Sequence, residues 1–185
     1  MRNTVIAGVF GLICVVAAVA RGDTIGVYSD NMGTSCNIID NTTGMLSIYV
    51  VHISTEGATA SEFSAPKPDC MVGATYLSDT VAFFEVGNTQ TGTSIPYGTC
   101  RMGPTHAVTM IFFAHGTSEP CCLYPVLPDP RPPVGGDVLA EDCDGNTVAA
   151  AGLVATVNGN ATCPCGYPVP VEETTWGQVK AMFSE

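Results

Sequence analysis

Residues 105–122 read THAVTMIFFAHGTSEPCC, and this stretch decides the fold. Within it, residues 107–114 form an apolar run in which only Thr109 is polar. A run of this length that is rich in Val, Ile and Phe, and is followed by Gly and Pro, is typical of a β-strand buried on both faces. We therefore expect residues 107–114 to be a central strand that is covered by other layers on both sides.

Side chains alternate between the two faces of a strand, so the central segment divides into two sets. One set is His106, Val108, Met110, Phe112 and Ala114, and the other is Ala107, Thr109, Ile111, Phe113 and His115. Each set would face a different layer of the domain.

Shorter segments rich in β-branched and aromatic residues lie on both sides of the central one, and Gly, Pro, Asn and Asp residues separate them. The expected strands span residues 24–29, 45–53, 80–86, 138–142 and 153–157, with the last two forming a closing hairpin. The predicted fold class is all-β. We expect a disulfide-stabilised antiparallel β-sandwich, immunoglobulin-like in broad architecture, with a short C-terminal helix.

Residues 1–20 have the features of a signal peptide. Arg2 precedes an apolar segment at 5–19, and Ala18 and Ala20 form an A-x-A cleavage site. The apolar segment is short for a membrane span, so we expect cleavage rather than a retained anchor, and no membrane span afterwards. The chain would then be secreted to the periplasm, the cell surface or the medium.

The mature chain would consist of a β-sandwich domain at 21–163, a Pro-rich extended linker at 164–173 and a C-terminal helix at 174–185. Without residues 1–20 it has five basic and seventeen acidic residues, a net charge of −12. Nucleic-acid binding requires clustered Lys and Arg, and the five basic residues are scattered. The composition therefore excludes a nucleic-acid partner.

Cysteine usage predicts the compartment and the cross-links. Eight cysteines follow the leader, and an even number in an exported chain indicates disulfide bonds. They are Cys36, Cys70, Cys100, Cys121, Cys122, Cys143, Cys163 and Cys165. A zinc site built from residues 121, 122, 163 and 165 is the alternative, but the C-x-x-C spacing of zinc knuckles is absent from the sequence.

The pairing of these cysteines is constrained by strand geometry. Neighbouring residues on a strand point to opposite faces, so Cys121 and Cys122 should bond to different partners. The expected bonds are Cys36 to Cys70, Cys100 to Cys121 or Cys122, and Cys143 to Cys163 or Cys165.

The segment at 142–146 is a candidate calcium site. Asp142, Asp144 and Asn146 place oxygen donors at the first, third and fifth positions of a calcium loop. However, Thr147 stands where such a loop has Gly, and Leu153 stands where it has Glu. A structural turn is the favoured interpretation, and Ca²⁺ is the only cofactor that the sequence suggests.

Catalytic motifs give little support for an enzyme. His52, His106 and His115 lie in or at the end of apolar segments, without the spacing of a metal site. A Gly-x-Ser-x-Gly elbow does not occur, and an even cysteine count leaves no spare thiol nucleophile. A hydrolase of unrecognised type therefore stays only an alternative.

The C-terminal tail has helix signals. Thr175 and Gln178 fit a capping box, and Trp176, Val179 and Phe183 would share one face. So short a helix is marginal alone, and it would have to dock on a partner or on the chain's own core.

The stretch EETTWGQVKAMF in this tail resembles a terminal peptide of the form Glu-x-Thr-Thr-Trp-Gly-x-Ile/Val-Lys. That peptide recurs in uncharacterised small secreted bacterial proteins that contain cysteines. A looser likeness, a double cysteine followed by Asp-Cys and Cys-x-Cys, covers residues 121–165. The resemblance implies a sorting or docking tag and implies no activity.

Together these observations predict a secreted, non-catalytic structural or interaction domain with a protein or glycan partner. A calcium-assisted module that binds carbohydrate or another ligand is the main alternative.

Overall fold

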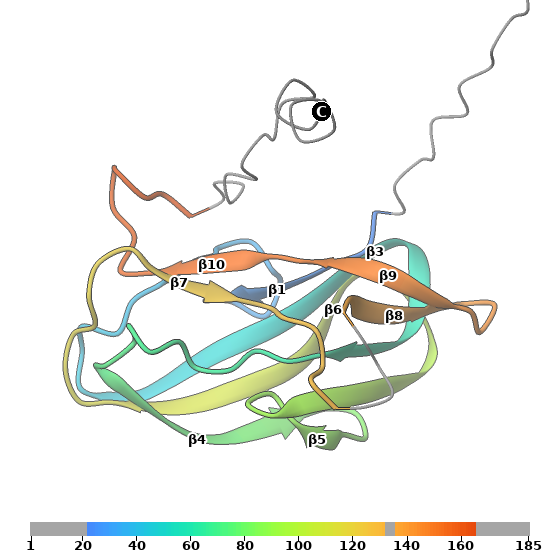
Figure 1. Cartoon of the computed structure of the whole chain (residues 1–185), viewed down its shortest axis with the longest axis horizontal. Helices are drawn as coiled ribbons and strands as arrows, with labels where there is room; N and C mark the ends of the chain where they lie inside the picture. Colours follow the sequence, from blue (N-terminus) through green and yellow to red (C-terminus); the bar gives the residue numbers. More distant parts are fainter. Residues whose placement is uncertain (1–21, 132–135, 166–185) are drawn as a thin grey trace, which may run out of the picture.

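The computed structural model describes residues 22–131 and 136–165 (Figure 1). This part of the chain is all-β and contains no helix, and so no helix long and apolar enough to span a membrane. Its strands are β1 (Thr24–Tyr28), β2 (Asn37–Ile38), β3 (Gly44–Phe63), β4 (Ala74–Val81), β5 (Val86–Asn88), β6 (Gly92–Ala114), β7 (Cys122–Pro125), β8 (Val138–Asp142), β9 (Thr147–Gly152) and β10 (Val154–Val157).

The strands form two sheets that pack into a sandwich. The larger sheet has the order β1-β9-β8-β3-β6-β4, with β5 also paired to β6, and the smaller has the order β2-β10-β7. In Figure 1 the smaller sheet lies across the molecule from β3, β6 and β4. The two sheets are in direct contact, because the Tyr124 hydroxyl of β7 lies 3.4 Å from the Met110 sulfur of β6.

The two longest strands, β3 and β6, pair with each other along most of their length. The first half of β3 also pairs with β1, and its second half pairs with β8. The register shifts between Ser54 and Ala58, where the strand passes from one set of neighbours to the next. Gly57 has a φ of +95° at this bend, a conformation that glycine adopts without strain.

The alternation predicted for the central segment is confirmed from Val108 onward and is wrong before it, because a register shift at Val50/Val51 leaves Ala107 buried and puts His106 on the outer side, beside Tyr49. Val108, Met110 and Phe112 are fully buried, whereas Phe113 is 41% exposed. The expectation that both faces are covered is wrong for the end of the strand. A second layer packs on only one side of β6, so Phe113 points away from the core.

The predicted fold class is wrong in two respects, although the all-β, disulfide-stabilised sandwich is confirmed. First, the sandwich is not purely antiparallel, because β1 pairs in parallel with β9 and β10 pairs in parallel with β2. The sandwich therefore has mixed strand pairing, and the expectation of a purely antiparallel one is wrong. Second, no helix supplements the strands in the described part, and the helix expected at 174–185 lies outside it.

Other expectations differ in detail. The signal peptide at 1–20 also lies outside the described residues, as does the linker after residue 165. The strand expected at 80–86 is in fact split between the end of β4 and the start of β5. The closing hairpin is β8–β9, while residues 154–157 form β10 in the smaller sheet, and only Leu153 separates β9 from β10.

Four disulfides join the eight cysteines after the leader. The pairs are Cys36–Cys165, Cys70–Cys122, Cys100–Cys143 and Cys121–Cys163. Cys121 and Cys122 do bond to different partners, as predicted. All the pairings expected from the sequence are wrong, and the alternative of a zinc site is replaced by these bonds.

Candidate functional site

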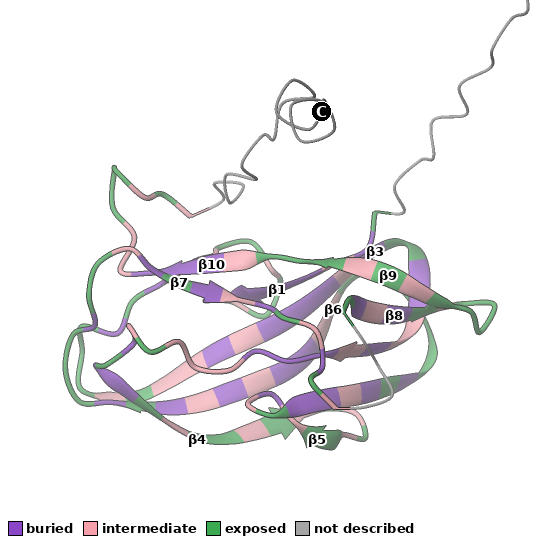
Figure 2. Cartoon of the chain, in the orientation of Figure 1, coloured by how far each residue is buried: buried purple, intermediate pink, exposed green. Residues whose placement is uncertain are grey.

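An uncharged outer face covers the side of β3, β6 and β4 that points away from the smaller sheet. Its residues alternate with buried ones along β3 and β6 and mostly with half-buried ones along β4, as the banding of these strands in Figure 2 shows. We define the outer face as Met45, Ser47 and Tyr49 of β3, Thr109, Ile111 and Phe113 of β6, and Thr75, Ser78 and Thr80 of β4.

The most apolar row of the outer face runs straight across the three strands. Phe113 lies in register between Met45 of β3 and Thr75 of β4. Met45 is 66% exposed and Phe113 is 41% exposed. Ile111 follows on the same side of β6 and is half-buried. Large apolar side chains thus meet water at adjacent positions of a regular sheet.

The outer face has no charged group at any of its nine positions. The one acidic residue of β4, Asp79, points to the other side of the sheet. There its carboxylate accepts hydrogen bonds from the Thr89 amide, at 2.7 Å, and the Thr89 hydroxyl, at 2.9 Å. Burial raises the pKa of Asp79, although the bonds from Thr89 and Tyr76 oppose that shift. The charge is therefore held away from the outer face.

Two histidines lie beside the outer face and are held there. The His106 ring stands edge-on to Tyr49, with the centroids 5.5 Å apart, and its Nε2 lies 2.9 Å from the Thr109 hydroxyl. His115 Nε2 lies 3.2 Å from the Thr75 hydroxyl. These contacts orient Tyr49, Thr109 and Thr75 of the outer face.

The third histidine, His52, lies on the opposite side of β3, inside the domain. Its Nδ1 is 3.0 Å from the Tyr97 hydroxyl, while its Nε2 and the nearby Asp23 Oδ1 are buried without a hydrogen-bond partner. Burial lowers the pKa of His52, and the charge of Asp23 opposes the shift. The structure therefore does not bring the three histidines together. Within residues 22–131 and 136–165, no group of three His, Cys, Asp or Glu residues could hold a metal ion.

The candidate calcium residues lie in the turn between β8 and β9. Asp142 Oδ1 accepts hydrogen bonds from the amides of Asp144 and Asn146, at 2.9 and 2.8 Å. The Asn146 side-chain amide also donates to both carboxylate oxygens, at 3.2 and 3.1 Å. Asp142 and Asn146 are thus brought together, and Asp144 contributes its amide to the turn. Calcium binding here stays a prediction.

A small cleft lies over the other half of β3, and no pattern in the sequence predicted it. Its volume is about 90 Å³, and it is lined by Ala60, Ser61, Glu62, Ser94, Leu139, Ala140, Glu141 and Thr147. Ligand pockets usually measure a few hundred Å³ or more, so this cleft is too small for most organic ligands. None of the three histidines lines it.

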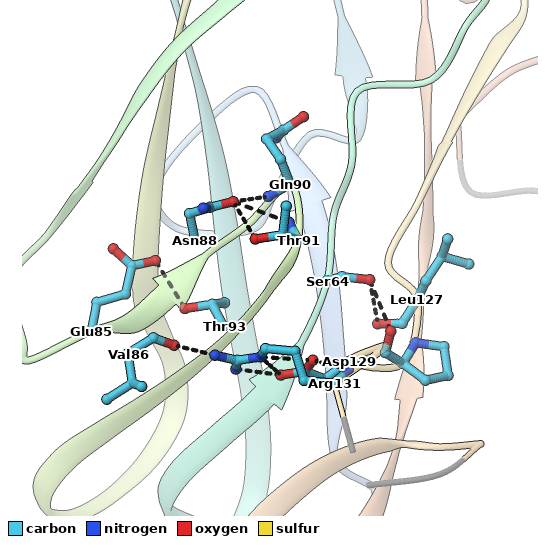
Figure 3. Close-up of polar contacts among 11 residues, drawn as sticks. Ser64, Glu85, Val86, Asn88, Gln90, Thr91, Thr93, Leu127, Asp129 and Arg131 are labelled. Carbon is cyan, nitrogen blue, oxygen red and sulfur yellow. Dashed lines mark hydrogen bonds and ion pairs between the residues drawn. The ribbon is translucent and has the colours of Figure 1, made fainter. Parts of the chain in front are cut away.

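Next to this cleft, an ion pair fixes the chain between β7 and β8 (Figure 3). The Arg131 Nε donates to both oxygens of Asp129, at 3.0 and 2.9 Å, and its Nη1 donates to the Val86 carbonyl at 3.1 Å. The Asp129 carboxylate lies so close to Gly92 that a Cβ there would be 2.1 Å from Oδ1. Burial would raise the pKa of Asp129, but hydrogen bonds from Arg131 hold it below its usual value. This arrangement is structural, since both charged groups are occupied by each other.

Comparisons with known proteins give structural likeness alone. No family model matches the chain, and no curated protein matches it. It is similar to the sixth cohesin of Acetivibrio cellulolyticus scaffoldin B, solved with a Cel5 dockerin mutant, at 12% identity and a TM-score of 0.49, over 75% of this chain and 99% of that one.

Two other cohesin structures are similar to a comparable degree. One is a type I cohesin–dockerin complex from Clostridium thermocellum, with 10% identity, a TM-score of 0.48, and coverage of 74% of this chain and 99% of that one. The other is a non-cellulosomal cohesin from Archaeoglobus fulgidus, with 13% identity, a TM-score of 0.46, and coverage of 76% and 93%. At these scores the likeness indicates no function for this chain.

Proposed function

We propose that the chain is a non-catalytic interaction domain that works outside the cytoplasm and binds a protein partner through its outer face. The observation that carries this proposal is the exposed row of Met45 and Phe113 on a sheet face that has no charge. Soluble sheets usually place charged or polar side chains on the face that meets water. Exposed large apolar side chains that adjoin one another mark interaction sites, whereas scattered ones do not.

The chemistry of the outer face supports a protein rather than a small ligand. The face belongs to a pleated sheet, and its centre is made of Met, Ile and Phe side chains. Methionine and aromatic residues are enriched at the cores of protein interfaces, and charged residues are depleted there. Because Tyr49 and Thr75 are already held by histidine contacts, a partner would meet a preorganised surface, and less entropy would be lost on binding.

The cysteines and histidines of the described part of the chain are engaged in structural contacts. Its eight cysteines are joined as disulfides, which removes a thiol nucleophile. His106 and His115 contact threonines of the outer face, and His52 is buried against Tyr97. These positions support a binding role.

The four disulfides also support the compartment. Bonds of this kind form and persist in oxidising environments outside the cytosol. The leader expected at 1–20 would bring the chain there, and its export is part of the proposal.

The test uses the mature chain, residues 21–185, as bait for proteins from the medium and envelope of the source cells. Its face variant carries Met45→Asp and Phe113→Asp, and its control variant carries Leu123→Asp. Leu123 is a matched control because it is 51% exposed but lies on β7 of the other sheet. Each captured protein is then purified, and its affinity is measured by isothermal titration.

We expect the purified partner to bind the wild type and the control alike, and to bind the face variant at least about tenfold more weakly, as at other interface centres. Circular dichroism and melting curves establish that all three chains are folded. Equal affinity for the face variant and the wild type would refute the proposal.

A further inference from the structure

We infer that the domain contains an internal binding site for one water molecule, at the bend of β3. The inference goes beyond the proposed function, because the site lies inside the sandwich and not on the outer face. It is carried by buried polar atoms. In the described part of the chain, the buried side-chain atoms that have no hydrogen-bond partner are Asp23 Oδ1, His52 Nε2 and Ser61 Oγ. The three residues are at most 4% exposed.

Asp23 and His52 lie close together, although one precedes β1 and the other belongs to β3. In the antiparallel pair of these strands, His52 lies opposite Ile25. Asp23 comes two residues before Ile25 and is buried like it, so both side chains leave the same face of the pair. Diagonal neighbours of this kind are about 7–8 Å apart, which side chains can span. Burial lowers the pKa of His52, and the nearby charge of Asp23 opposes that shift.

The hydroxyl of Tyr97 connects Ser61 to the same place. It lies 3.0 Å from His52 Nδ1, and the two rings are 5.9 Å apart. Burial raises the pKa of Tyr97, the adjacent Ser61 side chain lowers it, and the charge of Asp23 raises it. Ser61 and Asp23 are therefore both close to the ring that contacts His52, and the three unpartnered atoms share one polar site.

The three atoms cannot satisfy one another, because two of them need a donor. A carboxylate oxygen such as Asp23 Oδ1 only accepts hydrogen bonds, and a neutral imidazole has one N–H. We assign this N–H to Nδ1 of His52, which faces the Tyr97 hydroxyl, so Nε2 is an acceptor as well. One water molecule supplies what is missing, since it donates to these two acceptors and accepts from the Ser61 hydroxyl.

Water fits the site better than other ligands do. Internal waters typically make about three hydrogen bonds to buried polar groups that otherwise lack a partner, and this site offers three such atoms. A metal ion would need more ligands, and no group of three His, Cys, Asp or Glu residues that could hold one occurs within residues 22–131 and 136–165. The residues around the site are almost inaccessible from outside, which leaves no entry for an organic molecule.

The water links segments at a place where strand pairing is irregular. The register of β3 shifts between Ser54 and Ala58, so His52 and Ser61 lie on either side of the bend. Hydrogen bonds from one water molecule to both residues, and to Asp23 beside β1, hold the bend and the N-terminal strand together.

The first test is a crystal structure of the mature chain at a resolution that shows ordered waters, combined with nitrogen NMR of the His52 ring at mildly alkaline pH. We expect one water peak within about 2.7–3.2 Å of all three unpartnered atoms. We also expect the ring proton on Nδ1, an assignment that a crystal structure alone does not show.

The second test counts long-lived internal waters in solution by magnetic relaxation dispersion of the water signal. Ser61→Val replaces the hydroxyl with apolar atoms and fills the site. Ser94→Val is the matched control, because Ser94 precedes Ile95, the residue that pairs with Ser61 on β6, and is not among the unpartnered residues. We expect the count to fall by one in Ser61→Val and to stay unchanged in Ser94→Val, with circular dichroism establishing that both variants are folded.

Three results would overturn the inference. They are a direct bond between Asp23 and His52 with no water peak beside Ser61, a ring proton on Nε2 of His52, and a water count in folded Ser61→Val equal to that of the wild type. If Ser61→Val does not fold, the first test still decides. None of these results concerns the outer face, so failure of the proposed function would appear separately, as equal partner binding by the wild type and the face variant.

Discussion

The substitution Gly57→Ala tests how the bend of β3 is built. Gly57 has a φ of +95° and lies beneath the Cys100–Cys143 disulfide. A Cβ at this position would be 2.6 Å from the Cys143 sulfur and 2.8 Å from the Cys100 sulfur. Alanine would therefore meet two separate obstacles, the backbone conformation and the two sulfur atoms.

These obstacles can be separated by a double-mutant cycle. A non-glycine residue in this backbone region costs about 1–3 kcal/mol of unfolding free energy. Forcing a methyl group into an occupied site costs about 1–3 kcal/mol more. We therefore expect Gly57→Ala to cost about 2–6 kcal/mol in the wild type. In a Cys100→Ala, Cys143→Ala background the sulfurs are gone, and the cost should fall to about 1–3 kcal/mol.

The assay is urea unfolding of the two backgrounds and of their Gly57→Ala and Gly103→Ala variants, six chains in all, followed by fluorescence and circular dichroism. Gly103→Ala is the matched control, because Gly103 has a φ of +76° and no atom within 4 Å of the position of a Cβ. Gly103→Ala should lower the free energy of unfolding by the same amount in both backgrounds, since only the backbone conformation opposes the substitution. If Gly57→Ala also cost the same in both backgrounds, the disulfide would not press on Gly57, and the proposed construction of the bend would be refuted.

Three further predictions address the core and its charges. Phe112→Ala should cost about 3–5 kcal/mol and Phe113→Ala less than about 0.5 kcal/mol in urea unfolding, because only Phe112 is buried. Since the pKa of His52 is lowered in the fold, stability should fall as pH drops below 6.5, and His52→Asn should flatten that curve from pH 5 to 8. Asp129→Asn should lower the free energy of unfolding by about 1–3 kcal/mol at neutral pH. The difference in stability between wild type and variant should narrow as pH falls below 3.8, because the pKa of Asp129 is lowered in the fold. The first prediction would be contradicted by equal losses of stability for Phe112→Ala and Phe113→Ala. The second would be contradicted by a pH–stability curve that His52→Asn leaves unchanged, and the third by a stability difference between wild type and Asp129→Asn that does not vary with pH.

Local patterns in the sequence predicted β1, β8, β10 and parts of β3 and β6, but missed β9 and most of β4. The alternation in residues 108–114 places Phe112 inside and Phe113 outside, as a period of two requires. The bend of β3 could not be predicted, because the segment after Ile53 has no alternation that distinguishes a strand from a loop. Its pairing depends on β8, which lies about eighty residues further along the chain, so only tertiary contacts make it a strand.

The cysteines illustrate what the sequence cannot determine. Their even number predicts disulfides, and the adjacency of Cys121 and Cys122 predicts different partners for them. Which partners they take depends on where the loops meet in space. Cys36 bonds to Cys165 across 129 residues, because the parallel pairing of β2 with β10 brings the two ends of the domain together. A parallel pair between such distant segments has no local sequence signal.

The failure of one prediction bears directly on function. The apolar run at 107–114 predicted a strand covered on both faces, yet one of its faces meets water at Phe113. A sequence pattern records that a side chain is apolar, and it does not record what covers that side chain. A core strand is covered by side chains of its own chain, and an interface strand is covered by side chains of a partner. Both kinds of strand have the same apolar sequence pattern. Met45, next to Phe113 on β3, is exposed as well, so the uncovered surface extends across strands and is not an isolated exception. The part of the sequence with the strongest core pattern is therefore the part for which a protein partner, as proposed above, would supply the missing layer.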